Sequence, residues 1–204
     1  MPDPLNKPLI NLDEILSGLS ERGYAVLDGA LAEPCLAAIV NYLGQLPELD
    51  FKPAGVGPGQ AQQLSTIRSD QIHWLPPEQP ALALYWRAME ALRLSANQAF
   101  YLGLFDYECH FAHYAAGSFY QKHWDAFRGR SNRRLSSVLY LNQGWQAEWG
   151  GELILYNEQN PDLIEATILP EMGRLVVFFS ELFAHEVKPA TRERWSLTGW
   201  FRVR

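Results

Sequence analysis

Three residues in the C-terminal half of the chain have the types and the spacing of a metal site. One residue separates His123 from Asp125, and His185 follows sixty positions after that aspartate. Residues i and i+2 of a strand point the same way, so the first two side chains can reach one ion. A histidine from another strand then completes a face of three ligands. Two histidines and one carboxylate on one face suit a non-haem Fe(II) oxygenase, which needs open positions for a cosubstrate and O₂.

An arginine and a tyrosine could hold an anion near that ion. Arg194 follows His185 by nine positions, and a guanidinium is a natural bidentate partner for the far carboxylate of a dicarboxylate ligand. Tyr140 can add a neutral donor. An inward-facing Arg194 requires an anion from the protein or from a ligand, because an unpaired buried charge is costly. A surface ion pair is the alternative interpretation of this arginine.

Two predicted strands carry polar side chains along one face. Alternation places Arg194, Ser196, Thr198 and Trp200 together in one strand, and Arg134, Ser136, Val138, Tyr140 and Asn142 together in the other. A polar face of a single strand can simply meet water. Several such faces that converge inside a barrel would instead form a polar pocket, and both interpretations stay open at this point.

The chain changes from helical patterns to strand patterns along its length. Apolar spacing and end signals predict helices over 11–23, 33–43 and about 78–99, with strands at 24–27 and 65–74. Eight further strands are predicted at 109–115, 118–125, 133–142, 151–157, 165–169, 174–180, 185–188 and 194–203. Short strands divided by turn residues are typical of a sandwich or jelly-roll barrel. We expect an α+β fold in one domain, 1–204, with a helical layer over about 11–99 supporting barrel strands over about 109–203.

Composition and charge exclude several classes of protein. The 204 residues are 48% hydrophobic, which supports a globular core, and no stretch is apolar enough to span a membrane. The net charge of −6 disfavours binding to nucleic acid or anionic lipid. Cys35 and Cys109 lie far apart, in no metal or redox spacing, and are expected to be buried thiols. We therefore expect a soluble, cytoplasmic protein without a nucleic-acid or membrane partner.

Five motifs occur in an order that resembles a known enzyme family. They are His-x-Asp at 123–125, Tyr-Leu-Asn at 140–142, Gly-Gly-Glu-Leu at 150–153, His-Glu-Val-Lys-Pro at 185–189 and Arg-x-Ser-x-Thr-x-Trp at 194–200. Together they resemble the prolyl 4-hydroxylase group of 2-oxoglutarate/Fe(II) dioxygenases, in particular the compact oxygen-sensing prolyl hydroxylases and their bacterial relatives. Upstream, Ile-Arg-Ser-Asp at 67–70 looks like the segment beside that branch's mobile substrate loop. The resemblance spans about 23–202 and implies a double-stranded β-helix, a cupin-like jelly-roll barrel.

The resemblance also implies roles for individual residues. His123, Asp125 and His185 would ligate Fe(II), and Arg194 and Tyr140 would bind the C5 carboxylate of 2-oxoglutarate. Tyr114 looks like the family tyrosine near the C1 end of 2-oxoglutarate. The loop before the metal motif is one residue shorter than in the animal enzymes, so His113 and Tyr120 are alternatives for this place. The implied cosubstrates are 2-oxoglutarate and O₂, with ascorbate as a reductant.

The implied reaction is hydroxylation of a peptidyl proline at C4, with release of succinate and CO₂. The implied substrate contacts are Arg68, Asp70, Arg133 and Trp200, and the Gly- and Pro-rich segment Lys52–Gln63 would order around the substrate. For a bacterial protein the favoured partner is elongation factor Tu. The basic residues Arg128, Arg130, Arg133 and Arg134 form either a docking patch for an acidic partner or a solvated turn.

Two alternatives from other classes remain open on the sequence. One is an oxygenase of the same fold that acts on a free amino acid or another small molecule. The other is a non-catalytic, cupin-like domain for metal binding or sensing. The intact set of His123, Asp125, His185 and Arg194 argues against the second alternative. A nucleic-acid demethylase fits poorly with the acidic charge balance.

Overall fold

The computed structural model of the chain describes residues 8–55, 66–77, 79–126 and 131–204. The helices are α1 (Leu12–Arg22), α2 (Glu33–Leu43) and α3 (Ala83–Phe100), with 3₁₀ turns at Glu48–Asp50, Pro80–Leu82 and Ala147–Trp149. Helix α1 begins where the Asn11 side chain accepts a hydrogen bond from the Glu14 amide, and it ends at Gly23 with φ 78°. Helix α3 begins five residues later than predicted, because Pro80–Leu82 form a 3₁₀ turn instead.

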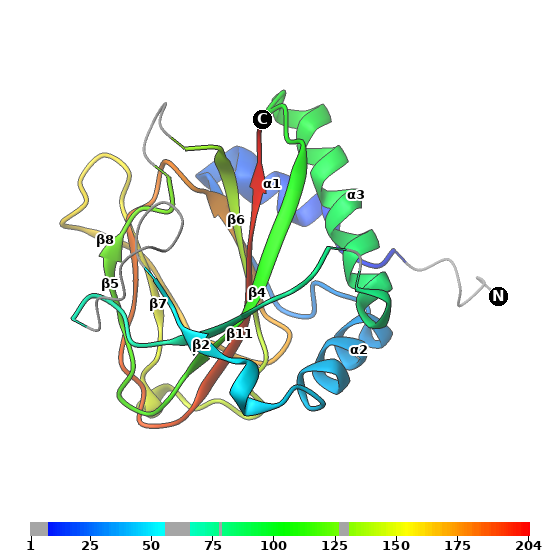
Figure 1. The fold of residues 1–204 in the computed structure, drawn as a ribbon. Coiled ribbons are helices and arrows are strands. Elements are labelled where there is room, and N and C mark those ends of the chain that lie inside the picture. Colours follow the sequence, from blue (N-terminus) through cyan, green and yellow to red (C-terminus); the bar gives the residue numbers. More distant parts are fainter. Residues whose placement is uncertain (1–7, 56–65, 78, 127–130) are drawn as a thin grey trace.

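Eleven strands of the described residues form two antiparallel sheets (Figure 1). The major sheet has the order β1-β9-β6-β11-β4-β3-β2 and the minor sheet the order β5-β10-β7-β8. The major strands are β1 (Tyr24–Leu27), β2 (Lys52–Pro53), β3 (Gln71–Trp74), β4 (Asp106–Tyr114), β6 (Arg133–Tyr140), β9 (Leu175–Phe179) and β11 (Arg194–Arg202). The minor strands are β5 (Tyr120–His123), β7 (Leu153–Tyr156), β8 (Ile164–Ile168) and β10 (His185–Val187). The arrangement confirms the predicted α+β class and the double-stranded β-helix.

The predicted strand at 65–74 was wrong over its first half. Only Gln71–Trp74 form β3, and a turn occupies Thr66 and Ile67. The backbone there bonds to the segment around β5 instead of to β4: the Ser69 amide donates to Phe119, and the Ile67 carbonyl accepts from Gln121. Period-two alternation alone did not distinguish a strand from this turn and the backbone that follows it.

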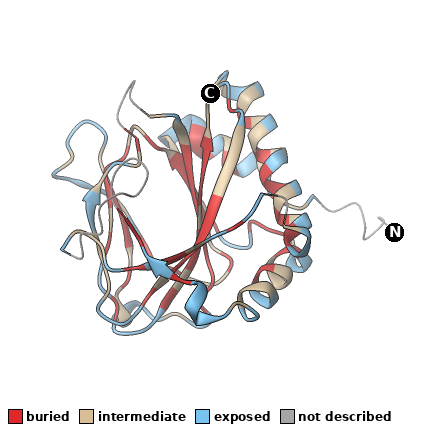
Figure 2. Cartoon of the chain, in the orientation of Figure 1, coloured by how far each residue is buried: buried red, intermediate tan, exposed pale blue. Residues whose placement is uncertain are grey.

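The major sheet has a helix face and a pocket face. The three helices cover the helix face (Figure 1), where the core includes Leu135, Leu139, Leu197 and Phe201 from β6 and β11. The pocket face points toward the minor sheet and carries the alternate residues of the same strands. Buried residues lie in the major sheet, in the helices on one side of it and in the minor sheet on the other (Figure 2). The polar faces predicted for these strands therefore form the inside of a barrel rather than meeting water. Within the described ranges, no helix is long and apolar enough to cross a membrane.

Candidate functional site

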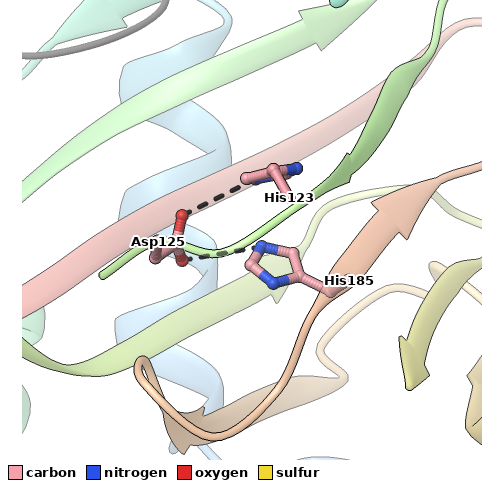
Figure 3. A group of neighbouring side chains, drawn as sticks. All are labelled: His123, Asp125 and His185. Atoms are coloured by element: carbon pink, nitrogen blue, oxygen red, sulfur yellow. Dashed lines mark ion pairs between the residues drawn. The ribbon is translucent and has the colours of Figure 1, made fainter. Parts of the chain in front are cut away.

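The structure brings His123, Asp125 and His185 together inside the barrel (Figure 3). One ligand atom from each side chain lies within 4.8 Å of the others. The Nε2 atoms of His123 and His185 lie 3.7 and 3.6 Å from the two carboxylate oxygens of Asp125. Strand pairing explains this placement, because His185 of β10 lies directly opposite His123 of β5, and Asp125 follows two residues after the histidine. The cluster has the composition and the spacing of a site for a divalent transition metal.

Hydrogen bonds orient both imidazoles toward the cluster. The Nδ1 atom of His123 lies 2.7 Å from the Gln121 carbonyl, and that of His185 lies 3.2 Å from the Phe183 carbonyl. A carbonyl only accepts, so each Nδ1 carries the proton and each Nε2 keeps a free lone pair. The orientation of the two rings is therefore the one that metal ligands commonly have.

Burial and neighbouring side chains set the protonation states of His185 and Asp125. Burial, with the neighbouring His123, lowers the pKa of His185 to about 4. Burial alone would raise the pKa of Asp125, but His185 and His123 hold it well below its usual range. At neutral pH the carboxylate is ionised and His185 is neutral, which are the forms that bind a metal ion.

Arg194 lies in the wall of the same cavity, which has a volume of about 120 Å³. Its side chain is buried, and its Nε donates to the Gly151 carbonyl at 2.9 Å. Gly151 has φ 76°, and a Cβ there would lie 2.9 Å from the Ala190 Cβ and 3.4 Å from the Arg194 Cδ. The glycine pair at 150–151 thus allows a close approach that other residues would block. Within the described part of the chain, no carboxylate forms an ion pair with Arg194, which leaves a buried cation facing the cavity.

Two tyrosines flank this arginine. The Arg194 guanidinium lies 4.9 Å from the ring centre of Tyr114 and 5.0 Å from that of Tyr140. Burial raises the pKa of both phenols, although Arg194 opposes that shift, so both hydroxyls remain protonated at neutral pH. The Tyr140 hydroxyl is buried without a hydrogen-bond partner among the described residues. The cavity wall therefore presents the Arg194 guanidinium, with the Tyr140 side chain beside it, a combination suited to a carboxylate.

The alternatives for Tyr114 separate by whether their side chains line the cavity. Tyr114 lines the cavity, whereas His113 points to the other side and stacks on Trp195 with ring centres 4.0 Å apart. Tyr120 also lines the cavity, where it stacks on His123 with ring centres 3.5 Å apart. Of the three candidates, the two tyrosines therefore face the cavity.

Arg68 lines the cavity and forms a buried ion pair with Asp70. Two nitrogens of the guanidinium donate to the two carboxylate oxygens at 2.7 and 2.6 Å. Arg68 also donates to the Gly55 carbonyl and lies over the ring of Tyr120, 4.2 Å from its centre. Burial would lower the pKa of Arg68, but Asp70 raises it above its usual value. The pair thus ties the chain beside Gly55 to the tyrosine that stacks on a ligand of the cluster.

Arg133 and Trp200 also line the cavity. The guanidinium of Arg133 lies 3.6 Å from the ring centre of Trp200 and donates to Glu108 at 3.0 Å. The indole N–H of Trp200 is buried without a partner among the residues that the structure describes. Arg134 pairs with Glu181, so these two arginines are not free cations of a docking patch. The other two members, Arg128 and Arg130, lie outside the described residues.

Sequence reasoning missed the place of His110. His110 lines the cavity beside Trp200, with ring centres 5.4 Å apart. Burial lowers its pKa to about 4, so it is neutral at pH 7. The alternation of β4 contains the signal, because His110 shares a face with Ala112 and Tyr114.

Comparisons with known proteins agree with this geometry. Residues 109–202 match the sequence profile described as the 2OG-Fe(II) oxygenase superfamily. The chain is 41% identical to a Pseudomonas putida prolyl-4-hydroxylase of known structure, over 95% of this chain and 100% of that one, with a TM-score of 0.83. A Trichoplax adhaerens prolyl hydroxylase, solved in complex with a hypoxia inducible factor peptide fragment, is 25% identical over 93% of this chain and 88% of that one, with a TM-score of 0.79. Mouse Egl nine homolog 1 is 27% identical over 98% of this chain but only 52% of that protein, so the chain spans about half the length of this relative.

Proposed function

Since the chain belongs to the 2OG-Fe(II) oxygenase superfamily and is of the prolyl hydroxylase type, we propose that it hydroxylates a prolyl residue of a protein substrate at C4. The family uses Fe(II), 2-oxoglutarate and O₂. The observation that carries the proposal is the placement of Arg194, a buried cation without a carboxylate partner in the described residues, in the same cavity as the His123, Asp125 and His185 cluster.

The residues present fit both groups that the family uses. His123, Asp125 and His185 would hold Fe(II), with two imidazoles and one carboxylate as donors. The guanidinium of Arg194, which has no carboxylate partner in the described residues, and the hydroxyl of Tyr140 would hold the C5 carboxylate of 2-oxoglutarate. Tyr114 lies beside Arg194 and would contact the same cosubstrate, although its place near the C1 end rests on the resemblance alone.

The protein's own contribution to the reaction is binding, orientation and exclusion of water. When bound, iron with 2-oxoglutarate supplies the activation of O₂ and the oxidation of an unactivated C–H bond, and succinate and CO₂ are released. Arg194 and Tyr140 would fix the far end of the cosubstrate by charge-assisted hydrogen bonds in a buried wall. The apolar side chains Val138, Leu153 and Val187 line the cavity and exclude water from the cluster. Ascorbate would serve as an external reductant.

A protein substrate would meet the chain at the cavity mouth. Arg68 and Asp70 would shape one side of this mouth, and Arg133 and Trp200 the other. Most of the segment Lys52–Gln63, expected to order around a substrate, lies outside the described residues. The finer proposal is elongation factor Tu as the substrate, on the strength of the likeness to a bacterial prolyl-4-hydroxylase. The protein would meet that partner in the cytoplasm. Its two cysteines are free and buried, which is consistent with a reducing compartment.

Cosubstrate binding is tested by spectroscopy without turnover. Anaerobic addition of Fe(II) and 2-oxoglutarate to the metal-free protein should produce the visible charge-transfer band of an iron-chelated keto acid. The band should disappear in Asp125→Ala and, at matched ligand concentration, in Arg194→Ala. Arg174→Ala is the matched control, because that arginine pairs with Asp28 outside the cavity. Iron binding without the band in the wild-type protein would leave a non-catalytic metal-binding domain as the better description.

The substrate is tested by mass spectrometry. The enzyme, supplied with Fe(II), 2-oxoglutarate and ascorbate, should add 16 Da to a proline of elongation factor Tu, in proportion to the succinate formed, and chromatography of the hydrolysed peptide should show 4-hydroxyproline. The His185→Ala variant is the control for adventitious oxidation. Stimulation of succinate formation by a free amino acid, but by no protein, contradicts the proposal and favours a small-molecule oxygenase.

A further inference from the structure

Two buried serines form a chain of hydroxyl groups that ends on Asp125. Ser136 Oγ lies 2.6 Å from Asp125 Oδ2, and Ser180 Oγ lies 2.9 Å from Ser136 Oγ. Both serines are at most 1% exposed. Ser136 belongs to the polar face of β6, and Ser180 follows directly after β9. Neither serine has a role in the site described above.

The direction of this chain follows from the chemistry of the carboxylate. Ionised Asp125 only accepts hydrogen bonds, so the Ser136 hydroxyl must be the donor between them. A hydroxyl has a single proton, and Ser136 therefore accepts from Ser180. The orientation of both hydroxyls is fixed, and each hydrogen bond polarises the next in a buried setting.

The position of Asp125 in the chain explains why it needs such a support. It lies two residues beyond the end of β5, where no strand pairing fixes its backbone. Ser136, in contrast, belongs to β6 in the major sheet, which pairs with both β9 and β11, and Ser180 directly follows β9. The backbone amide of Ser180 also donates to the Arg134 carbonyl at 3.0 Å. The hydroxyl chain thus connects a ligand on a loop to the most firmly paired part of the fold.

We propose that Ser180 and Ser136 are positioning residues that hold the Asp125 carboxylate for metal binding. Ser136 occupies one lone pair of Oδ2 and fixes the plane of the carboxylate. The other lone pairs of the carboxylate are then directed into the space that it shares with the two Nε2 atoms. The inference rests on the proposed metal site. Outer hydrogen bonds to a ligand commonly contribute about 10- to 100-fold to metal affinity.

Mn(II) binding to the metal-free protein, followed by electron paramagnetic resonance titration, tests this role without turnover. Ser136→Ala should raise the Kd for Mn(II) by about 10-fold or more. Ser180→Ala, which removes only the outer hydrogen bond, should raise it less. Ser136→Thr keeps a hydroxyl on a strand that tolerates β-branched residues and should restore most of the affinity. Each titration is normalised to the folded fraction measured by circular dichroism.

Ser137→Ala is the matched control, because this serine is the next residue of the same strand and is equally buried. Its hydroxyl lies on the helix face, 2.9 Å from the Tyr107 hydroxyl. This variant should lose stability without a change in the Kd for Mn(II). Wild-type affinity in Ser136→Ala, while Asp125→Ala abolishes binding, overturns the positioning role but leaves the metal site. Absence of wild-type binding, or binding that survives in Asp125→Ala, overturns both.

Discussion

The helix face and the pocket face of the major sheet treat their polar groups in opposite ways. On the helix face, the Tyr107 hydroxyl lies 2.7 Å from that of Tyr85 and 2.9 Å from that of Ser137, so these groups satisfy one another. Two exceptions on this side, within the described residues, are the indole N–H of Trp86 and the Nε2 atom of His113. The rest of the helix-side core is apolar.

On the pocket face, polar groups remain available. The Tyr140 hydroxyl and the Trp200 indole N–H are buried without a partner among the described residues, and Arg194 has no acidic partner there. An unsatisfied buried polar group costs about 1–3 kcal/mol. The same two strands, β6 and β11, build both faces. Alternate residues of one strand therefore divide two tasks: one set stabilises the fold, and the other includes buried polar groups without a partner in the described residues.

The largest effect is expected for a change on the helix face. Phe201→Ala removes a fully buried ring that packs on Tyr107, with ring centres 4.4 Å apart. The free energy of unfolding should fall by about 3–5 kcal/mol, as measured by urea denaturation. The Kd for Mn(II) of the folded fraction should stay within twofold of wild type. A large loss of metal affinity in fully folded Phe201→Ala protein would show that the two faces are not separable.

A change of Arg194 should have the opposite profile. Arg194→Met keeps much of the side-chain volume but removes the unpaired buried charge, so the ligand-free protein should be equally stable or more stable. The affinity for 2-oxoglutarate should fall by about 2–5 kcal/mol in binding free energy, as measured by calorimetry on the Mn(II) form. Strong destabilisation of the ligand-free protein would instead assign Arg194 a structural role.

His110 extends the comparison to pH. Its pKa of about 4 lies below its ordinary value of 6.5, mainly through burial and with Arg68 and Arg133 nearby, while Asp70 opposes the shift. The unfolded chain therefore binds the proton more readily, and this contribution to stability is complete above pH 6.5 and is lost as the pH falls toward 4. Between pH 7.5 and pH 5 it amounts to about 2 kcal/mol. Urea denaturation of His110→Gln should show a correspondingly smaller loss over this range, and an identical loss would contradict the assignment.

The smallest effects come from removing one hydroxyl on each face. Tyr107→Phe leaves the Tyr85 and Ser137 hydroxyls without their shared partner and should destabilise the protein by about 1–2 kcal/mol. Tyr140→Phe removes a hydroxyl that has no partner, so the ligand-free stability should not fall. Its affinity for 2-oxoglutarate should instead fall by roughly 1–2 kcal/mol, since a hydrogen bond to a charged group is lost. Thermal unfolding and calorimetry of the pair would show whether the effects separate in this way.

Local patterns in the sequence were sufficient for the elements that alternation or capping defines. They predicted the two faces of β6 and β11, the start of α1 at Asn11 and the strands that carry His123 and His185. The predicted strand at 118–125 was wrong at its end, because β5 stops at His123 and Asp125 lies two residues beyond it. They could not predict contacts that depend on which strands become neighbours. Ser180 meets Ser136 only because β9 pairs with β6, and residues 66–69 leave the β3 ladder because the segment around β5 competes for their backbone. The pairing and register of strands that are distant in the sequence depend on the packing of the whole barrel, so local sequence patterns do not predict them.

Strand β5 is held by backbone hydrogen bonds on both of its sides. On one side it pairs with β10, and on the other the residues around it share backbone hydrogen bonds with Ile67 and Ser69. The strand that carries His123 is therefore hydrogen-bonded to the segment that contains Arg68 and Asp70. A displacement of that segment is therefore transmitted to β5 through these hydrogen bonds. We expect amide hydrogen exchange at Gln121 to slow when a substrate binds beside Arg68. The exchange rate of this amide, two residues before His123, would then report substrate binding.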